Sequence, residues 1–310
     1  MIRTSRLAAL LVSALALNAC ALLDRKPVTG AAAPQASAAA PARQTTPNAT
    51  VERRPKGVWP QTYSDVAADP AVKFGTLPNG MRYALMKNAT PSGQASLRLR
   101  FDAGSIMERD DQQGLAHFLE HMAFNGSKDV PEGEMVKILE RHGLAFGADT
   151  NASTSFTETI YQLDLPKTDD STVDTSLMLM RQTASELTIA QAAVDRERGV
   201  VLSEERARDT PSLRSFVAMM DFLLPGHIVT KRLPIGKVEV LQTAPSSVIR
   251  QYYEAYYRPE RAVLVMVGDF DVAAMEAKIA KTFGDWKASA PVGPEPVLAQ
   301  PAPRGPAAKL

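Results

Sequence analysis

The sequence predicts an α+β fold, in which helices pack on a mixed, largely antiparallel sheet. The chain has 310 residues, of which 45% are apolar, so it can bury one large core or two small ones. Strand-like and helix-like segments are both abundant along the chain. They do not alternate in the strict βαβ order of a parallel sheet, and this combination fits an α+β domain best.

The first predicted elements are three strands and a helix. Residues 76–85 predict two strands joined at an Asn-Gly pair, which favours a tight hairpin turn. Residues 95–101 alternate apolar and polar side chains, which indicates a half-buried strand. Residues 112–125 carry apolar side chains at helical spacing, and the Asn-Gly pair at the end of this run is typical of a helix end.

The rest of the chain predicts further helices and short strands. Helices are expected where apolar residues recur every three or four positions, and strands where they alternate or form a short continuous run. In chain order these are helix 132–142, strands 148–153 and 158–165, helices 171–187, 190–208, 212–224 and 246–257, strand 262–268 and helix 272–283.

The first twenty residues have the pattern of a secretory signal peptide. Basic residues precede an apolar run, residues 7–17, that is too short to span a bilayer. Cys20, the only cysteine, lies where a bacterial lipobox carries the cysteine that becomes lipidated. We therefore expect an exported, periplasmic protein whose only membrane contact is a lipid anchor at Cys20. Simple export, with Cys20 incidental, is the alternative.

These patterns divide the chain into four segments. Residues 1–20 are the predicted signal peptide, and residues 21–57, rich in Ala, Pro, Thr and Gln, are predicted to be a disordered tether. Residues 58–289 are the predicted folded domain. Residues 290–310 are rich in proline and are predicted to be a linker. The chain is thus expected to stop where another domain would begin, so that a second domain is absent.

The charge balance argues against two classes of partner. The chain has 35 basic and 34 acidic residues, which leaves a formal charge of +1. Such a chain has no global field that would attract nucleic acid or an anionic membrane surface. Neither is therefore an expected partner.

The segment from His117 to His121 carries the clearest chemical signal. Its sequence, His-Phe-Leu-Glu-His, places two histidines four positions apart, so on a helix both imidazoles project from one face. Two imidazoles suit zinc, and Glu120 is placed to reach a water molecule at the metal without being a ligand. This is the inverted H-x-x-E-H arrangement. By itself so short a motif can arise by chance, because helix histidines are often surface residues.

A catalytic zinc ion takes three protein ligands, so a third donor is needed. Glu197 and Glu204 are seven residues apart on a predicted helix and therefore share a face. Glu204 is the predicted third ligand. Glu197 is predicted to orient one of the two histidines as a hydrogen-bond acceptor. A solvated surface carboxylate is the alternative for Glu197. The other two histidines, His142 and His227, are not placed in the zinc site.

Around these residues the sequence resembles the pitrilysin–insulinase family of metallopeptidases. The resemblance covers residues 74–286, nearly the whole predicted domain. It rests on Ala103-Gly104-Ser105, Glu108, the stretch from His117 to Gly126, residues 147–161, the stretch from Glu197 to Glu204, and Pro234-Ile235-Gly236.

The resemblance implies the half-chamber of LuxS/pitrilysin-like metalloenzymes, in which an edge strand beside the metal pairs with an extended peptide. Residues 148–153 are the expected strand. The implied function is a zinc-dependent metalloendopeptidase acting on peptides or unfolded proteins, with Glu120 as general base and Glu197 in the catalytic set. A second homologous domain or subunit is an expected partner. The alternatives are a non-catalytic peptide-binding or assembly subunit, and a hydrolase acting on another class of substrate.

Overall fold

In the computed structural model the described residues are 57–298, and they belong to a unit that begins at Gly57. The predictions of a signal peptide, of lipidation at Cys20 and of nearly all of the tether lie outside the described residues. Of the predicted proline-rich linker, residues 290–298 are described, and they form neither helix nor strand. Within the described part of the chain, no helix is both long enough and apolar enough to span a bilayer.

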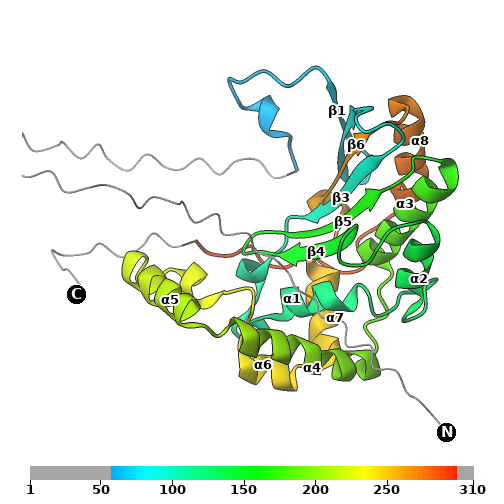
Figure 1. The fold of residues 1–310 in the computed structure, drawn as a ribbon. Helices are drawn as coiled ribbons and strands as arrows, with labels where there is room; N and C mark the ends of the chain where they lie inside the picture. The colour runs from blue at the N-terminus through cyan, green and yellow to red at the C-terminus, as the bar shows by residue number, and fades with distance from the viewer. Residues whose placement is uncertain (1–56, 299–310) are drawn as a thin grey trace, which may run out of the picture. The chain divides into compact units, whose positions relative to one another are not determined.

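A six-stranded sheet forms one layer of the fold (Figure 1). Its strands follow the order β1-β2-β6-β3-β5-β4. The β2–β6 pair is parallel and the other four neighbouring pairs are antiparallel, which confirms the predicted mixed, largely antiparallel sheet. The strands are β1 (Val72–Thr76), β2 (Arg82–Lys87), β3 (Ala95–Phe101), β4 (Thr150–Thr154), β5 (Thr159–Leu165) and β6 (Ala262–Gly268).

β6 is the last of these strands in the sequence but lies inside the sheet. It pairs with β2 on one edge and with β3 on the other. Its sequence is nearly continuously apolar, and five of its seven residues are buried. At its end Gly268 passes so close to β3 that a Cβ atom would lie 2.4 Å from the Cα atom of Ala95. Glycine is therefore needed where the two strands approach this closely.

The described residues contain eight α-helices, seven of which helical periodicity predicts. The exception is α6, whose six residues are too few to show a period. The helices are α1 (Leu115–Met122), α2 (Glu134–Arg141), α3 (Asp170–Ser185), α4 (Gln191–Arg208), α5 (Pro211–Leu223), α6 (Val238–Thr243), α7 (Ser246–Tyr256) and α8 (Val272–Phe283).

Helices α1, α3 and α8 lie on one face of the sheet (Figure 1). In β3 and β5 every second side chain is buried and the ones between are partly exposed, as expected for strands with one covered face. α3 packs on β5 and α8 packs on β2, while α1 packs against β4, α4 and α7. The core therefore lies between this sheet face and the helices, and α1 lies within it.

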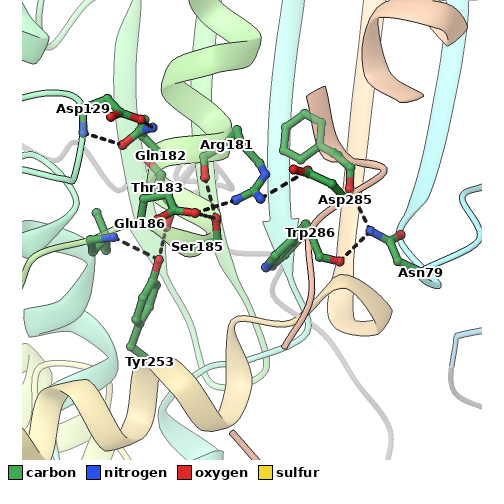
Figure 2. Close-up of polar contacts among 12 residues, drawn as sticks. Asn79, Asp129, Arg181, Gln182, Thr183, Ser185, Glu186, Tyr253, Asp285 and Trp286 are labelled. Carbon is green, nitrogen blue, oxygen red and sulfur yellow. Dashed lines mark hydrogen bonds and ion pairs between the residues drawn. The ribbon is translucent and has the colours of Figure 1, made fainter. Parts of the chain in front are cut away.

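Polar contacts fasten the ends of α3 and α8 to neighbouring elements (Figure 2). Tyr253 of α7 donates its hydroxyl to the Thr183 carbonyl at 3.1 Å. Asn79, in the turn between β1 and β2, donates its amide to the carbonyls of Phe283 and Trp286 at 2.7 and 3.0 Å. The Thr183 and Phe283 carbonyls are among those that helix ends leave without a partner in the helix, while Trp286 lies just beyond α8.

Candidate metal centre

α1 carries the predicted motif and is held by its apolar side. The side chains of Leu115, Phe118, Leu119 and Met122 are fully buried. Their spacing of three and four residues gives a continuous apolar stripe along the helix. Because α4, α7 and β4 pack around α1, this stripe fixes the rotation of the helix and so the direction of its polar side chains.

Glu108 and two glycines hold the start of α1. The Glu108 carboxylate accepts the N–H of Gly114 at 3.0 Å and of Ala116 at 2.8 Å, two groups that a helix start leaves unpaired. Burial raises the pKa of Glu108 to about 8, although these backbone N–H groups lower it in part. Gly236 packs on the same point, since a Cβ atom there would lie 2.4 Å from the Gly114 Cα atom.

The structure brings His117, His121 and Glu204 together between α1 and α4. The Nε2 atoms of the two histidines lie 3.2 Å apart. Glu204 Oε2 lies 3.5 Å from His117 Nε2 and 3.3 Å from His121 Nε2. Tetrahedral zinc with donors at about 2.0–2.1 Å holds those donors about 3.3–3.4 Å apart. The three separations match that spacing, and these residues form the group among the described residues that could hold a metal ion.

Glu197 lies behind one of the histidines. Its Oε1 atom is 2.7 Å from Nδ1 of His121, where it can accept a hydrogen bond from the Nδ1–H group, the arrangement that would turn the Nε2 atom toward a metal. Asn125 donates its amide to the other oxygen, Oε2, at 3.2 Å and to the His121 carbonyl at 3.0 Å. The sequence left open which histidine Glu197 contacts, and the structure shows that it is His121.

Charged groups interact strongly within this cluster. Burial lowers the pKa of His121, but hydrogen bonds to Glu197 and Glu204 outweigh burial and raise that pKa to about 9. Burial raises the pKa of Glu204, but hydrogen bonds to both histidines and the charge of Arg208 hold it well below its usual range. Arg208, one turn further along α4, pairs with Oε1 of Glu204, the oxygen that does not face the histidines. The donor carboxylate is therefore ionised and anchored on both sides.

Glu120 lies next to His121 on α1 but is not one of the three converging donors. Its side chain is half-buried, and its Oε2 atom accepts the hydroxyl of Thr154 at 2.5 Å. Thr154 is the last residue of β4, which forms an edge of the sheet. The predicted general base therefore touches the strand that sequence reasoning placed at the edge as residues 148–153.

The two remaining histidines lie in other parts of the fold, as the sequence predicted. His142 ends α2, and its Nδ1 atom contacts the Thr172 hydroxyl at 3.3 Å. His227 precedes a short 3₁₀ turn and accepts the N–H of Val229 at 3.2 Å. Both have local structural contacts, and neither belongs to the three-donor group.

Sequence reasoning missed three residues that touch the centre: Asn125, Thr154 and Arg208. Arg208 could have been found, because it follows Glu204 by four positions on a helix and so lies on the same face. For Asn125 the sequence indicates only a place at a helix end. Thr154 reaches Glu120 through the packing of β4 on α1, which no local pattern in the sequence shows.

Two family models match the chain. The model described as Insulinase (Peptidase family M16) matches residues 83–219, which contain all three donors, and the model described as Peptidase M16 inactive domain matches residues 246–309. This chain belongs to peptidase family M16. The resemblance inferred from the motif and its flanking segments is thereby confirmed.

Curated M16 relatives include proteins named as zinc proteases. The chain is 36% identical over 203 residues to the probable zinc protease PqqL of Haemophilus influenzae and 37% identical over 197 residues to that of Escherichia coli. These matches cover 66% and 64% of this chain but 22% and 21% of the relatives. The chain therefore spans about a fifth of the length of these curated relatives.

Solved M16 structures show the same fold. The first half of the periplasmic protease PqqL from Escherichia coli matches with a TM-score of 0.71 and 33% sequence identity. That match covers 74% of this chain and 49% of the PqqL chain. The predicted fold class is therefore confirmed both by the sheet order and by an M16 relative.

Proposed function

We propose that this chain is the zinc-binding, catalytic part of a metalloendopeptidase that hydrolyses peptide bonds. The spacing of the three donors on α1 and α4 carries the proposal, because it fits one tetrahedral zinc ion. The names of the PqqL relatives support the same activity. His117, His121 and Glu204 would hold the ion, and Glu197 would keep His121 oriented toward it.

An extended peptide would bind along the open edge of β4. The N–H of Asp164 donates to the Asp149 carbonyl, and the N–H of Ser155 donates to the Glu158 carbonyl. In this antiparallel pair the odd-numbered residues on the β4 side therefore bond to β5, and the even-numbered residues do not. The N–H and C=O groups of even-numbered residues, including Thr154, therefore point away from β5. The Thr150 carbonyl already accepts the N–H of Gly147. A peptide paired with Ala152 and Thr154 would gain main-chain hydrogen bonds whatever its side chains are.

The chain's own residues would carry the proton transfers. When bound, zinc polarises the scissile carbonyl and lowers the pKa of a water molecule. Glu120 would accept a proton from the attacking water and return it to the leaving amine. The contact between Glu120 and β4 places this carboxylate beside the proposed peptide site. Glu197 would support the reaction indirectly, by holding the ring of His121.

The experiment is a peptide-cleavage assay with the purified chain and quenched fluorescent peptides. Cleavage should stop with a zinc chelator and return when zinc is added. Glu120→Gln should keep its zinc, since Glu120 is not a proposed ligand, and should lose at least about 100-fold in kcat. Cleavage by Glu120→Gln at the rate of the unaltered chain would remove Glu120 from the role of base.

We propose in addition that a second M16 half completes the substrate site. Support comes from the length of the relatives, and from the M16 structure described as a first half of PqqL. The cleavage rate should rise when the chain is mixed with the remaining part of a PqqL relative. Peptide binding without cleavage in either sample would favour the second candidate, a peptide-binding or assembly subunit.

We also propose that the chain is exported to the periplasm and tethered there through lipid on Cys20. The signal-like residues 7–17 and the position of the single cysteine support this. The Escherichia coli PqqL structure is described as a periplasmic protease. The mass of the mature N-terminus tests the proposal, because an unmodified Cys20 or an uncleaved signal segment would contradict lipidation.

A further inference from the structure

We propose that Thr154 is a positioning residue for Glu120 and thereby links the peptide-binding edge of the sheet to the general base. The inference rests on the proposed peptidase function. It adds a residue from the sheet to a centre otherwise built from two helices, and its support is a contact and a strand alternation that are independent of the metal donors.

The first support is the contact itself. Thr154 Oγ1 lies 2.5 Å from Oε2 of Glu120. An ionised carboxylate can only accept hydrogen bonds, so the threonine hydroxyl is the donor. The distance is that of a charge-assisted O–H···O bond, which is stronger than a bond between neutral groups. Among residues 57–298, this is the only side-chain hydrogen bond that Glu120 makes.

The second support is the direction in which Thr154 points. Along β4 the side chains of Thr150, Ala152 and Thr154 lie on the same face, because a strand alternates with a period of two. Thr150 is 2% exposed and Ala152 packs against the core, so this face is turned toward the helices. The Thr154 side chain is therefore directed at α1 by the strand itself, with no rearrangement needed.

The hydrogen bond from Thr154 fixes the position of the Glu120 carboxylate. A glutamate side chain on a helix has three torsions to fix, and α1 offers Glu120 no hydrogen bond from its own side chains. The bond from Thr154 occupies Oε2 and leaves Oε1 as the oxygen that can accept a proton from water. A base held in one geometry avoids the loss of rate that a misplacement of about 1 Å causes.

The consequence for substrate placement follows from the backbone of the same residue. The N–H and C=O groups of Thr154 point to the open edge of β4, by the alternation of the β4–β5 ladder. A peptide paired with that edge would thus bond to the backbone of the same residue whose side chain holds the base. Thr154 would set the register between the scissile bond and Glu120.

Three variants test the proposal. Thr154→Val keeps the shape and the β-branch but removes the donor. Thr154→Ser keeps the donor. Thr157→Val is the matched control, because Thr157 is an exposed residue of the β4–β5 turn with no contact to Glu120. For each variant we would measure kcat and KM on a fluorescent peptide, zinc affinity by chelator competition, and the position of the Glu120 side chain by crystallography.

The expected kinetics separate positioning from folding. Thr154→Val should lower kcat about 10- to 100-fold, the range for losing a hydrogen bond to a charged group, and should change KM less than about twofold. Thr154→Ser should recover most of the kcat that Thr154→Val loses, Thr157→Val should keep the kcat of the unaltered chain, and all variants should bind zinc equally. A Thr154→Val kcat equal to that of the unaltered chain, or a Thr154→Ser kcat as low as that of Thr154→Val, would overturn the proposal.

The crystal structures separate this proposal from the peptidase function. If the unaltered chain cleaves no peptide with zinc present, either alone or mixed with the remaining part of a PqqL relative, the proposed function fails, and the position of Glu120 then decides the role of Thr154. A Glu120 carboxylate that leaves its place in Thr154→Val but not in Thr157→Val supports positioning. An unmoved carboxylate in Thr154→Val, or a loss of zinc affinity in that variant, overturns it.

Discussion

Replacing Glu197 by glutamine removes a charge behind His121 and changes almost nothing in size. In the structure Glu197 Oε1 lies 2.7 Å from His121 Nδ1, and the two side chains are 17% and 8% exposed. So little exposure leaves the pair weakly screened by salt. The second oxygen, Oε2, accepts the amide of Asn125 at 3.2 Å. A glutamine that turns its oxygen to His121 must turn its NH₂ group to the NH₂ group of Asn125, so one of the two contacts is lost.

The expected size of the effect follows from the role of the carboxylate. Partners that orient a metal-bound histidine typically contribute 10- to 100-fold in metal affinity. This corresponds to about 1.4–2.7 kcal/mol. Because Glu197→Gln loses both the charge and one hydrogen bond, we expect a result in the upper part of that range.

The assay is competition for zinc between the chain and a chromophoric chelator at fixed pH. Glu205→Gln is the matched control, since Glu205 is a neighbouring glutamate on α4 that does not belong to the donor group. The control should bind zinc like the unaltered chain. Equal zinc affinity in Glu197→Gln and Glu205→Gln would refute the reasoning, because the contact to His121 would then contribute nothing to the centre.

Two further predictions concern stability. In the chelator-treated chain the folded-state pKa of His121 is raised to about 9 from an ordinary 6.5, so its contribution to stability is complete below pH 6.5 and is lost as the pH rises through 9. Between pH 6.5 and pH 9 the free energy of unfolding, measured with urea, should fall by up to about 3 kcal/mol more in the unaltered chain than in His121→Ala. Parallel plots of unfolding free energy against pH for the two proteins would contradict this. Gly236→Ala should destabilise the fold by about 2–5 kcal/mol, because the residue has φ of +83° and a Cβ atom would lie 2.4 Å from the Cα atom of Gly114, the residue before α1. Gly226→Ala, with φ of +75° and open space around it, should cost only about 1–2 kcal/mol, and equal melting temperatures for the two variants would be inconsistent with close packing at Gly236.

Much of the fold could be predicted because its signals are local. β6 and α8 have the predicted bounds, 262–268 and 272–283, since a continuous apolar run and a helical period each show in a short window. The helix predicted at residues 112–125 is shorter in the structure, because Gly114 adopts φ of +98° and α1 begins after it. Boundaries of this kind depend on backbone conformation that the apolar pattern does not contain.

The arrangement of the strands depends on long-range pairing and was not predicted. No local pattern indicates that β6 lies between β2 and β3. The same limit applies to the centre. His117 and His121 are four residues apart and could be paired from the sequence, and the helical spacing of Glu197 and Glu204 suggested their common face. The contact of Thr154 with Glu120 joins two elements through tertiary packing.

The central claim is that two imidazoles of α1 and one carboxylate of α4 hold a single zinc ion. It is tested most directly by titrating zinc into the metal-free chain and into Glu204→Ala, with elemental analysis of both after dialysis. We expect the unaltered chain to retain one equivalent of zinc and Glu204→Ala to lose at least about 100-fold in affinity, since it keeps only two of three ligands. Zinc retained by Glu204→Ala at the affinity of the unaltered chain would contradict the account.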